Sequence, residues 1–391
     1  MRVWKRCDRL ELRMQYRFFR GLTILFCSLV FLTACSIPQV SAEDRMFVDL
    51  SLNFLGKYEL SKPILSEDQP VSQLSSLTYQ VPGYGTSTDG GIQFYGLSDV
   101  AIAESPAKFY TLNFNLETSE SINLKDITLE GLTVLKDKQE QPLLANQVYP
   151  ESIAFSPRHS VFIAAENLEN VNTPPFIAEY DLKTGQLKNT VPLSSFYVPK
   201  FNESEQTQGV EPKFGFKALT ISPDGFSPDG RDPFRLFTVT EKPLIQDRDP
   251  ENATKLRLLH YVIADRASFL VSEMLYLLDE TSQKLVDITA GQGGTLLSLE
   301  QSENTGKIYQ LFTGDATDTS RIKSLKGNGI KVQPVRKKLL LDLQDLGIPL
   351  QQLSGMTLGS RLPDGSQSLV LMSEDDKNTT EFLLLSLRVG H

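Results

Sequence analysis

Acidic side chains are the residues of this chain whose types and spacing could do chemistry. Five segments share a short apolar run, a turn built from Pro, Asp, Gly or Ser, and a second apolar run. In four of them the second run ends in an acid, the fifth ends in Glu374-Asp375-Asp376, and one more acid opens the second segment. The candidate metal ligands chosen from these acids are Asp99, Glu151, Glu166, Glu241, Glu300 and Asp375.

Carboxylates that share one site repel each other unless some are protonated or a cation is bound. Ca²⁺ is the cation we expect, because it accepts many oxygen ligands in flexible geometry. Bound Ca²⁺ would polarise a phosphoryl group and activate water, with Glu151, Glu241 and Glu300 as the catalytic carboxylates. The cations that could receive such a substrate are Lys213, Lys217, Arg231, Arg235 and Lys242. The alternative is that each acid is a solvated strand end or a cap within its own sheet.

Several other chemistries lack the residues they need. Only His159, His260 and His391 are present and no cysteine follows Cys35, so a zinc site or histidine catalysis has too few groups. No G-x-S-x-G nucleophile elbow occurs. Metal-assisted hydrolysis of a phosphate ester is the catalytic hypothesis that survives.

β-Strands are the elements that would position these acids. The five segments are Gln73–Asp99, Tyr149–Asn167, Phe214–Lys242, Leu285–Gln301 and Gln352–Asp376, with starts roughly 65 to 75 residues apart. Each period has enough chain for a four-stranded sheet and an insertion, and radially repeated sheets form a β-propeller. We therefore expect an all-β fold, a β-propeller of six blades that gathers the acids at one mouth of its channel. Five or seven blades, or a pair of β-sandwiches, are the alternatives.

Three polar stretches are predicted to be surface insertions between the repeated segments. They are Pro199–Phe214, Gln246–Thr254 and Gly314–Val332.

The amino-terminal leader predicts export. Seven basic residues precede the apolar run Leu22–Leu32, which is too short to span a bilayer as a mature helix. Leu32-Thr33-Ala34-Cys35 resembles a bacterial lipobox, so we expect a signal peptide at 1–34, lipid on Cys35, a tether at 35–46 and one domain at 47–391. Cleavage after Ala42, or a start at Met14, are the alternatives. The protein would be lipid-anchored to a bacterial membrane and face the periplasm or the exterior.

The charge of the remaining chain limits its partners. The whole chain has a net charge of −9, and beyond the first 34 residues there are 32 basic and 46 acidic residues, a net charge of −14. This argues against nucleic acid as a partner. All three cysteines lie in the leader, so no disulfide forms within the mature chain. We expect a monomer whose partner is a small phosphate ester or another envelope ligand.

The ordered set of motifs resembles the phytase-like family described as "esterase-like activity of phytase". The motifs are FYGLSD at 94–99, PESIAFSP at 150–157, FGFKALTISPDG at 214–225, LLSLEQ at 296–301 and SGMTLGSRLPDG at 354–365. The resemblance covers Gln73 to Leu387. It implies an exported β-propeller that is loosely related to the Ca²⁺-dependent propeller phytases.

The resemblance also assigns positions in this chain. The family's repeated Glu-Gly start matches Glu151, and its strand-ending acids match Glu166, Glu241 and Glu300. The chain departs from the family at Lys217 and Ser354, where the family has Glu, and at Gln301, where it has Arg. Two missing carboxylates weaken a metal cluster, and a lysine among acids would form an ion pair at the channel mouth. Two hypotheses follow: a Ca²⁺-dependent phosphoesterase, or a non-catalytic propeller that binds a protein, a glycan or a small ligand.

Overall fold

The computed structural model describes residues 46–391 with gaps. The residues outside the description are 1–45, 61–64, 67–68, 71–73, 83–91, 100–104, 118–121, 145, 167, 169–173, 228–229, 250–253, 281–282, 304, 328–330, 349–351, 375–379 and 391. The predicted signal peptide, Cys35, Asp375 and His391 therefore lie outside the described residues. Contacts divide the chain into two units, Met1–Met46 and Phe47–His391. Within the described part, no helix has the length and apolar character needed to cross a membrane.

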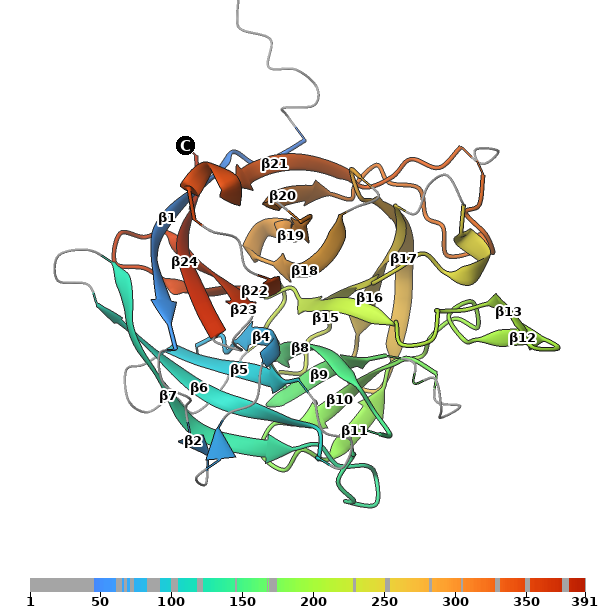
Figure 1. Ribbon diagram of the computed structural model, residues 1–391, viewed down its shortest axis with the longest axis horizontal. Coiled ribbons are helices and arrows are strands. Elements are labelled where there is room, and N and C mark those ends of the chain that lie inside the picture. The colour runs from blue at the N-terminus through green and yellow to red at the C-terminus, as the bar shows by residue number, and fades with distance from the viewer. Residues whose placement is uncertain are drawn as a thin grey trace, which may run out of the picture. The chain divides into compact units, whose positions relative to one another are not determined.

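The described strands of the second unit form a five-bladed β-propeller (Figure 1). Each blade is a four-stranded antiparallel sheet, and the first strand of each blade lies innermost, where it contacts the first strands of both neighbouring blades. Blade 1 is β4 (Leu74–Tyr79), β5 (Ile92–Ser98), β6 (Lys108–Glu117) and β7 (Asn123–Val134). Blade 2 is β8 (Pro150–Ser156), β9 (Ser160–Ala165), β10 (Phe176–Asp181) and β11 (Leu187–Thr190). Blade 3 is β14 (Phe216–Ile221), β15 (Phe234–Thr240), β16 (Lys255–Ile263) and β17 (Ser268–Leu277). Blade 4 is β18 (Lys284–Ala290), β19 (Leu296–Gln301), β20 (Gly306–Phe312) and β21 (Arg336–Asp342). Blade 5 is β22 (Gln352–Arg361), β23 (Gln367–Glu374), β24 (Thr380–Val389) and β1 (Leu50–Glu59).

Smaller elements lie between the blades. They are two short hairpins, β2 (Leu65–Ser66) with β3 (Gln69–Pro70) and β12 (Lys200–Asn202) with β13 (Glu205–Gln208), and three 3-10 helices, η1 (Ile245–Asp247), η2 (Gln292–Gly294) and η3 (Leu343–Leu346).

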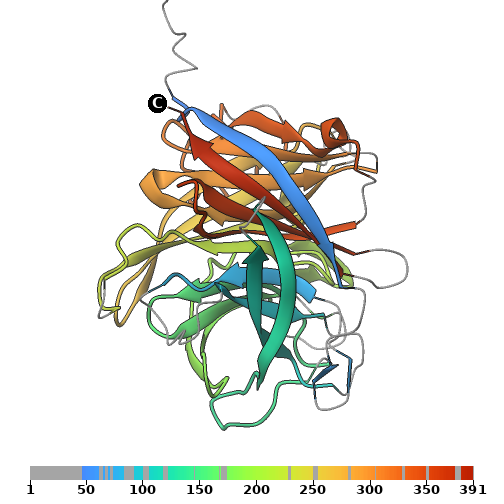
Figure 2. The same ribbon diagram turned by 90° about the vertical axis from the view of Figure 1, so that its left-hand side faces the viewer.

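The predicted all-β propeller is confirmed, but the described residues form five blades rather than six. The strand before the first repeated segment, β1, does not begin a blade of its own. It pairs with β24, from Leu50 opposite Val389 to Glu59 opposite Glu381, and completes blade 5 (Figure 2). The ring is therefore closed by strands from the two ends of the domain.

The hydrophobic core lies between adjacent blades, in five clusters that each join one blade to the next. Every residue of β8 and β9 is buried, whereas the outer strand β7 alternates between more and less buried positions. An inner strand is covered on both faces and therefore has a nearly continuous apolar sequence, while an outer strand has one face exposed to solvent. Phe162 of blade 2 and Phe234 of blade 3 show the contact, with ring centroids 6.0 Å apart in an edge-to-face arrangement.

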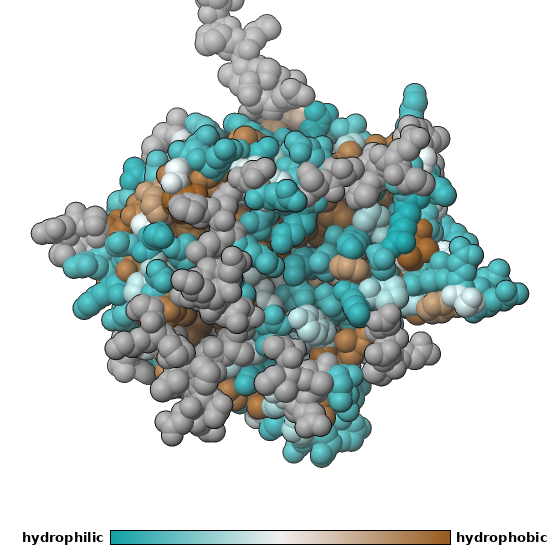
Figure 3. Space-filling model, in the orientation of Figure 1, coloured by the Kyte–Doolittle hydropathy of each residue, from teal (hydrophilic) through white to brown (hydrophobic). Residues whose placement is uncertain are grey.

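The outer surface is mostly polar. Hydrophilic residues cover most of the described surface in the view of Figure 3, and apolar residues form separate patches between them. The exposed large apolar side chains include Val48, Leu132, Val198, Phe201, Phe269, Val271, Leu339 and Val389, which lie on several different elements.

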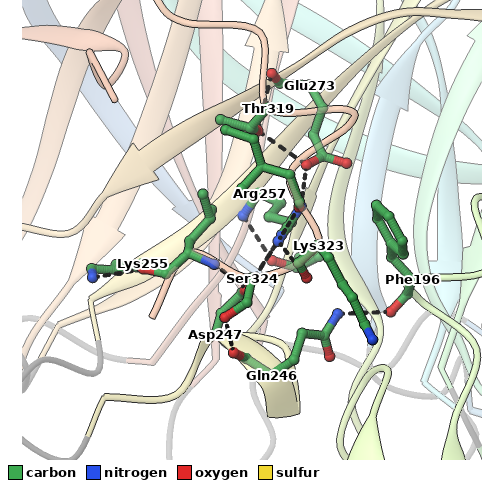
Figure 4. A network of polar contacts seen from close by, with 12 residues as sticks. Phe196, Gln246, Asp247, Lys255, Arg257, Glu273, Thr319, Lys323 and Ser324 are labelled. Atoms are coloured by element: carbon green, nitrogen blue, oxygen red, sulfur yellow. Dashed lines mark hydrogen bonds and ion pairs between the residues drawn. The ribbon is translucent and has the colours of Figure 1, made fainter. Parts of the chain in front are cut away.

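The three predicted insertions meet at the outer side of blade 3, around the buried side chain of Arg257 (Figure 4). The guanidinium donates to Asp247 of η1 at 2.7 and 2.9 Å, to Glu273 of β17, and to the carbonyl of Ile322 at 3.1 Å. Gln246, next to Asp247, accepts the backbone N–H of Gly209 in the first insertion at 2.9 Å and donates to the carbonyl of Phe196 at 3.1 Å. Arg257 thus binds two of the loops directly, and Gln246 links the third loop to them.

Candidate functional site

A β-bulge interrupts each of the five innermost strands close to its start. The residues at the bulges are Ser75, Glu151, Lys217, Val286 and Ser354. A blade of four antiparallel strands returns the chain to its starting end, so the innermost strands all run the same way and the bulges lie at one end of the channel. We call it the strand-start end. Bulges are common next to functional sites because the extra residue re-aims a side chain.

The second strand of each blade finishes at this same end. On this second strand, the residue that pairs with the one directly before the bulge is Ser98, Ala165, Thr240, Glu300 or Ser373. The next residue along the chain therefore occupies an equivalent position in every blade. These five residues, which we call the strand-end ring, are Asp99, Glu166, Glu241, Gln301 and Glu374.

Three of the six predicted acids do not belong to this ring: Glu151, which lies at the bulge of β8, Glu300 and Asp375. Glu300 precedes it by one residue, and since side chains alternate along a strand, the Glu300 side chain faces the other side of the sheet. There it is fully buried and accepts hydrogen bonds from the Tyr276 hydroxyl at 2.5 Å and the Lys337 ammonium at 2.6 Å. In blade 5 the ring position is held by Glu374, and the predicted Asp375 lies outside the described residues.

The structure brings Glu151, Glu166 and Glu241 together around Lys217, and we call these four residues the central cluster. The Lys217 ammonium forms an ion pair with the Glu151 carboxylate, as the sequence predicted for a lysine among acids. The two side chains come from the bulges of adjacent blades and are 23% and 8% exposed. The Glu166 side chain is hydrogen-bonded to those of Glu151 and Glu241.

Burial and mutual repulsion set the charges of the central cluster. Burial, followed by the charges of Glu151 and Glu241, raises the pKa of Glu166 to about 10, so this carboxyl is protonated at neutral pH. Burial also raises the pKa of Glu241, against the influence of Lys217. Burial alone would lower the pKa of Lys217, but the charges of Glu151 and Glu241 raise it above its usual value. A neutral Glu166 and a charged Lys217 leave little negative charge uncompensated.

The rest of the strand-end ring links neighbouring blades. Glu374 accepts the backbone N–H of Leu74 in blade 1 at 3.2 Å, and Gln301 accepts that of Leu353 in blade 5 at 3.0 Å. Burial and the charge of Asp99 raise the pKa of Glu374 to about 7. The equivalent of Leu74 in blade 2 is Pro150, which has no N–H, and Asp99 instead accepts the Tyr149 hydroxyl at 2.7 Å.

The described residues do not fit a Ca²⁺ site. Among them, no group of three or more His, Cys, Asp or Glu side chains is arranged to hold a metal ion. Within the central cluster an ammonium takes the place next to Glu151 that a cation would need. The cluster can hold and transfer protons, because a neutral carboxyl lies beside ionised groups.

Sequence reasoning missed two groups near this end of the channel. Asp287 is 4% exposed on the innermost strand of blade 4 and accepts the backbone N–H groups of Ile288 at 2.8 Å and Met356 at 2.9 Å. Burial raises the pKa of Asp287 to about 7 against these hydrogen bonds. An acid inside the apolar run Leu285–Ala290 was the available signal. For Tyr149 the sequence offered no such signal, because a tyrosine directly before a strand is common.

Comparison with known proteins assigns a family to this arrangement. The family model "Phytase-like: Esterase-like activity of phytase" matches residues 69–377, most of the chain. The chain belongs to the phytase-like family. No curated protein matches this phytase-like chain.

Solved structures similar to this phytase-like propeller are distant in sequence. "Structure of Dos1 propeller" has 10% identity and a TM-score of 0.32, and the match covers 82% of this chain and 69% of that one. "Structure of U3-55K" has 9% identity and a TM-score of 0.34, with 85% and 98% covered. The haemagglutinin-neuraminidase ectodomain of parainfluenza virus 5 has 7% identity and a TM-score of 0.36, with 98% and 99% covered.

Proposed function

We propose that this phytase-like propeller is a non-catalytic binding protein of the bacterial envelope. The observation that carries the proposal is the ion pair between Lys217 and Glu151. In a Ca²⁺-dependent hydrolase the carboxylates at this end would bind the metal, and the metal would polarise the phosphoryl group. Here an ammonium neutralises Glu151, Glu166 is protonated, and Glu300 is paired with Lys337 away from the cluster.

The proposal includes export and a lipid anchor at Cys35. Its support is the basic and apolar leader and the lipobox-like residues 32–35. A lipidated Cys35 would hold the propeller at the membrane through its amino-terminal end. The Cys35→Ser variant, expressed in a bacterium, should move from the membrane fraction to the soluble fraction, whereas Cys27→Ser should not. Equal membrane retention of both variants would contradict the anchor.

The binding role is tested against hydrolysis with one substitution. Purified protein lacking residues 1–46 is assayed for phosphate release from p-nitrophenyl phosphate and phytate, with Ca²⁺ or with a chelator. We expect no turnover and no change in melting temperature on adding Ca²⁺. Lys217→Glu replaces the ammonium with a carboxylate, so this variant should be destabilised without Ca²⁺ and should gain melting temperature when Ca²⁺ is added.

Lys217→Gln is the matched control, because it removes the same charge without adding a ligand. It should show no Ca²⁺ response. Chelator-sensitive phosphate release by the unmodified protein would overturn the proposal and leave the Ca²⁺-dependent phosphoesterase as the function.

A further inference from the structure

The opposite end of the channel holds a large cavity, which we call the hairpin-end cavity. Its volume is about 1000 Å³, and residues from the turns that join the first two strands of blades 1, 3, 4 and 5 line it. Phe155, Ile221 and Phe226 are among the apolar residues that line it. Pockets of this size with apolar walls and a few converging polar groups commonly bind small molecules. None of the central cluster lines the cavity, so it is a separate site.

Four threonines form the floor of the cavity. Thr78, Thr220, Thr289 and Thr357, the threonine ring, lie at equivalent positions three residues after the bulges, and Ala154 has that position in blade 2. In three of the four, the hydroxyl oxygen already accepts a backbone N–H from the next blade. The donors are Phe155 to Thr78 at 3.0 Å, Ala290 to Thr220 at 3.0 Å and Leu358 to Thr289 at 3.3 Å.

These three hydroxyl groups keep a proton to donate. A threonine hydroxyl is one donor as well as an acceptor, and among the described residues Thr78, Thr220 and Thr289 donate to no protein acceptor. Each side chain retains some surface towards the cavity, because the residues are 9%, 8% and 4% exposed. The floor therefore offers converging donors and suits a ligand oxygen that accepts hydrogen bonds.

Among the described residues, the rim of the cavity provides one positive charge that has no carboxylate partner. Arg388 forms an ion pair with Asp364 at 2.5 Å, which also accepts two hydrogen bonds from Ser366. Arg361 has no carboxylate partner in the described part of the chain and makes only a 3.3 Å hydrogen bond to the carbonyl of Gly365. It follows Thr357 by four residues on β22, which places it on the order of 12 Å along the strand from the threonine ring.

We infer that the hairpin-end cavity binds an elongated organic acid whose carboxylate pairs with Arg361 and whose far end carries an oxygen that accepts hydrogen bonds from the threonine ring. The apolar middle of the ligand packs against Phe155, Ile221 and Phe226. This inference deepens the proposed binding role and rests on it.

Three probes with the same chain length test the two ends separately, by isothermal titration calorimetry on the protein lacking residues 1–46. They are ω-hydroxydecanoate, which has both groups, decanoate, which lacks the far oxygen, and the decanediol with a hydroxyl at each end, which lacks the charge. We expect ω-hydroxydecanoate to bind most tightly with one site per chain. Each missing group should weaken binding by about fivefold to tenfold, the effect of one hydrogen bond or exposed charge pair.

Two variants assign each end to its residues. Arg361→Gln, at an exposed position, should weaken ω-hydroxydecanoate and decanoate but leave the diol unchanged. Thr220→Val with Thr289→Val should weaken ω-hydroxydecanoate and the diol but leave decanoate unchanged. The probe that lacks the relevant group controls for structural damage, and Arg361→Gln keeps the test valid if the threonine variant does not fold.

The inference is overturned if no probe binds with one-site saturation, or if either variant weakens all three probes equally. Its failure is distinguishable from that of the proposed function. Phosphate release with Ca²⁺ would overturn the binding role whatever the probes do, while the absence of probe binding without phosphate release would overturn the cavity assignment alone.

Discussion

Glu166 controls the charge of the central cluster. It lies against two other carboxyl groups, and one neutral member lets Glu151 and Glu241 share the positive charge of Lys217. Like charges this close cannot all ionise in a buried setting, so one proton is retained. A protonated Glu166 beside the ion pair of Lys217 and Glu151 is a stable arrangement near neutral pH.

The pH dependence of stability follows from the raised pKa of Glu166. The folded state keeps this proton up to about pH 10, whereas the unfolded chain loses it near the ordinary glutamate value of 4.5. The folded state therefore binds more protons between these limits, and the free energy of unfolding must fall as pH rises, by at most about 1.4 kcal/mol per pH unit. Glu166→Gln mimics the protonated form. In urea unfolding between pH 5 and pH 9, the free energy of unfolding of this variant should therefore fall less with rising pH than that of the unmodified protein.

Some pH dependence should persist in Glu166→Gln. The pKa values of Glu374 and Asp287 are both raised to about 7 by burial and act in the same direction. Glu130→Gln, which alters an exposed acid on β7, is the control and should follow the unmodified protein. Identical slopes for Glu166→Gln and the unmodified protein would contradict a protonated Glu166.

A comparison of Glu300 with Gln301 shows how far the sequence could locate the ring at the residue scale. Both end the run Leu296–Gln301, and only the acid looked functional. The register places Gln301 in the strand-end ring and turns Glu300 to the opposite face. A shift of one residue exchanges the two faces of a strand, and the bulge that sets the register leaves no clear mark in one sequence. Lys217 was recognised because a lysine stands out among acids.

At the scale of elements, the five repeated segments were correctly predicted to be pairs of strands, and the structure makes each pair the first two strands of a blade. Their short apolar runs and turn residues are local features, so they can be recognised directly in the sequence. The gathering of Pro199–Phe214, Gln246–Thr254 and Gly314–Val332 around Arg257 was not predictable. An arginine within the run Leu256–Ala264 gives no indication of which distant loops supply its carboxylate and carbonyl partners.

Removal of Arg257 should loosen these loops. Arg257→Met leaves the buried carboxylates of Asp247 and Glu273 without their cation, and breaking a buried ion pair in this way costs about 3 to 5 kcal/mol. Urea unfolding should show this loss, and limited proteolysis should cut the connection between β20 and β21 faster.

An exposed ion pair in the same region provides the control. Arg248 and Glu211 are 47% and 30% exposed, so Arg248→Gln should change the free energy of unfolding by less than about 1 kcal/mol. Equal effects of the two substitutions would show that Arg257 contributes no more than a surface charge.

At the scale of the whole molecule, closure of the ring depends on β1. The all-β propeller follows from the repeat, but the repeat did not fix the number of blades: six were expected, with five or seven as the alternatives, and the described residues form five. β1 pairs with β24 over most of its length, and its absence would leave β24 as an exposed edge. Apolar and polar residues alternate along much of Leu50–Glu59, as in any outer strand. This pattern does not indicate which strand it pairs with, and the partner lies at the other end of the domain.

Deletion of β1 should therefore damage the whole propeller. A variant that begins at residue 61 should lose cooperative unfolding or melt at a much lower temperature than one that begins at residue 47, as followed by circular dichroism. Light scattering should also show aggregation through the open edge. Equal melting temperatures for the two variants would mean that blade 5 is stable with three strands.

Closure by β1 also imposes an order on assembly. During synthesis this strand emerges before the strands of blades 1 to 4, yet its partner β24 emerges only after them, with Leu50 opposite Val389. The nascent chain must therefore keep an unpaired strand in solution until those four blades have emerged. Pairing across such a sequence distance is slow, so the newly made propeller passes through a long interval in which a holding chaperone would bind it.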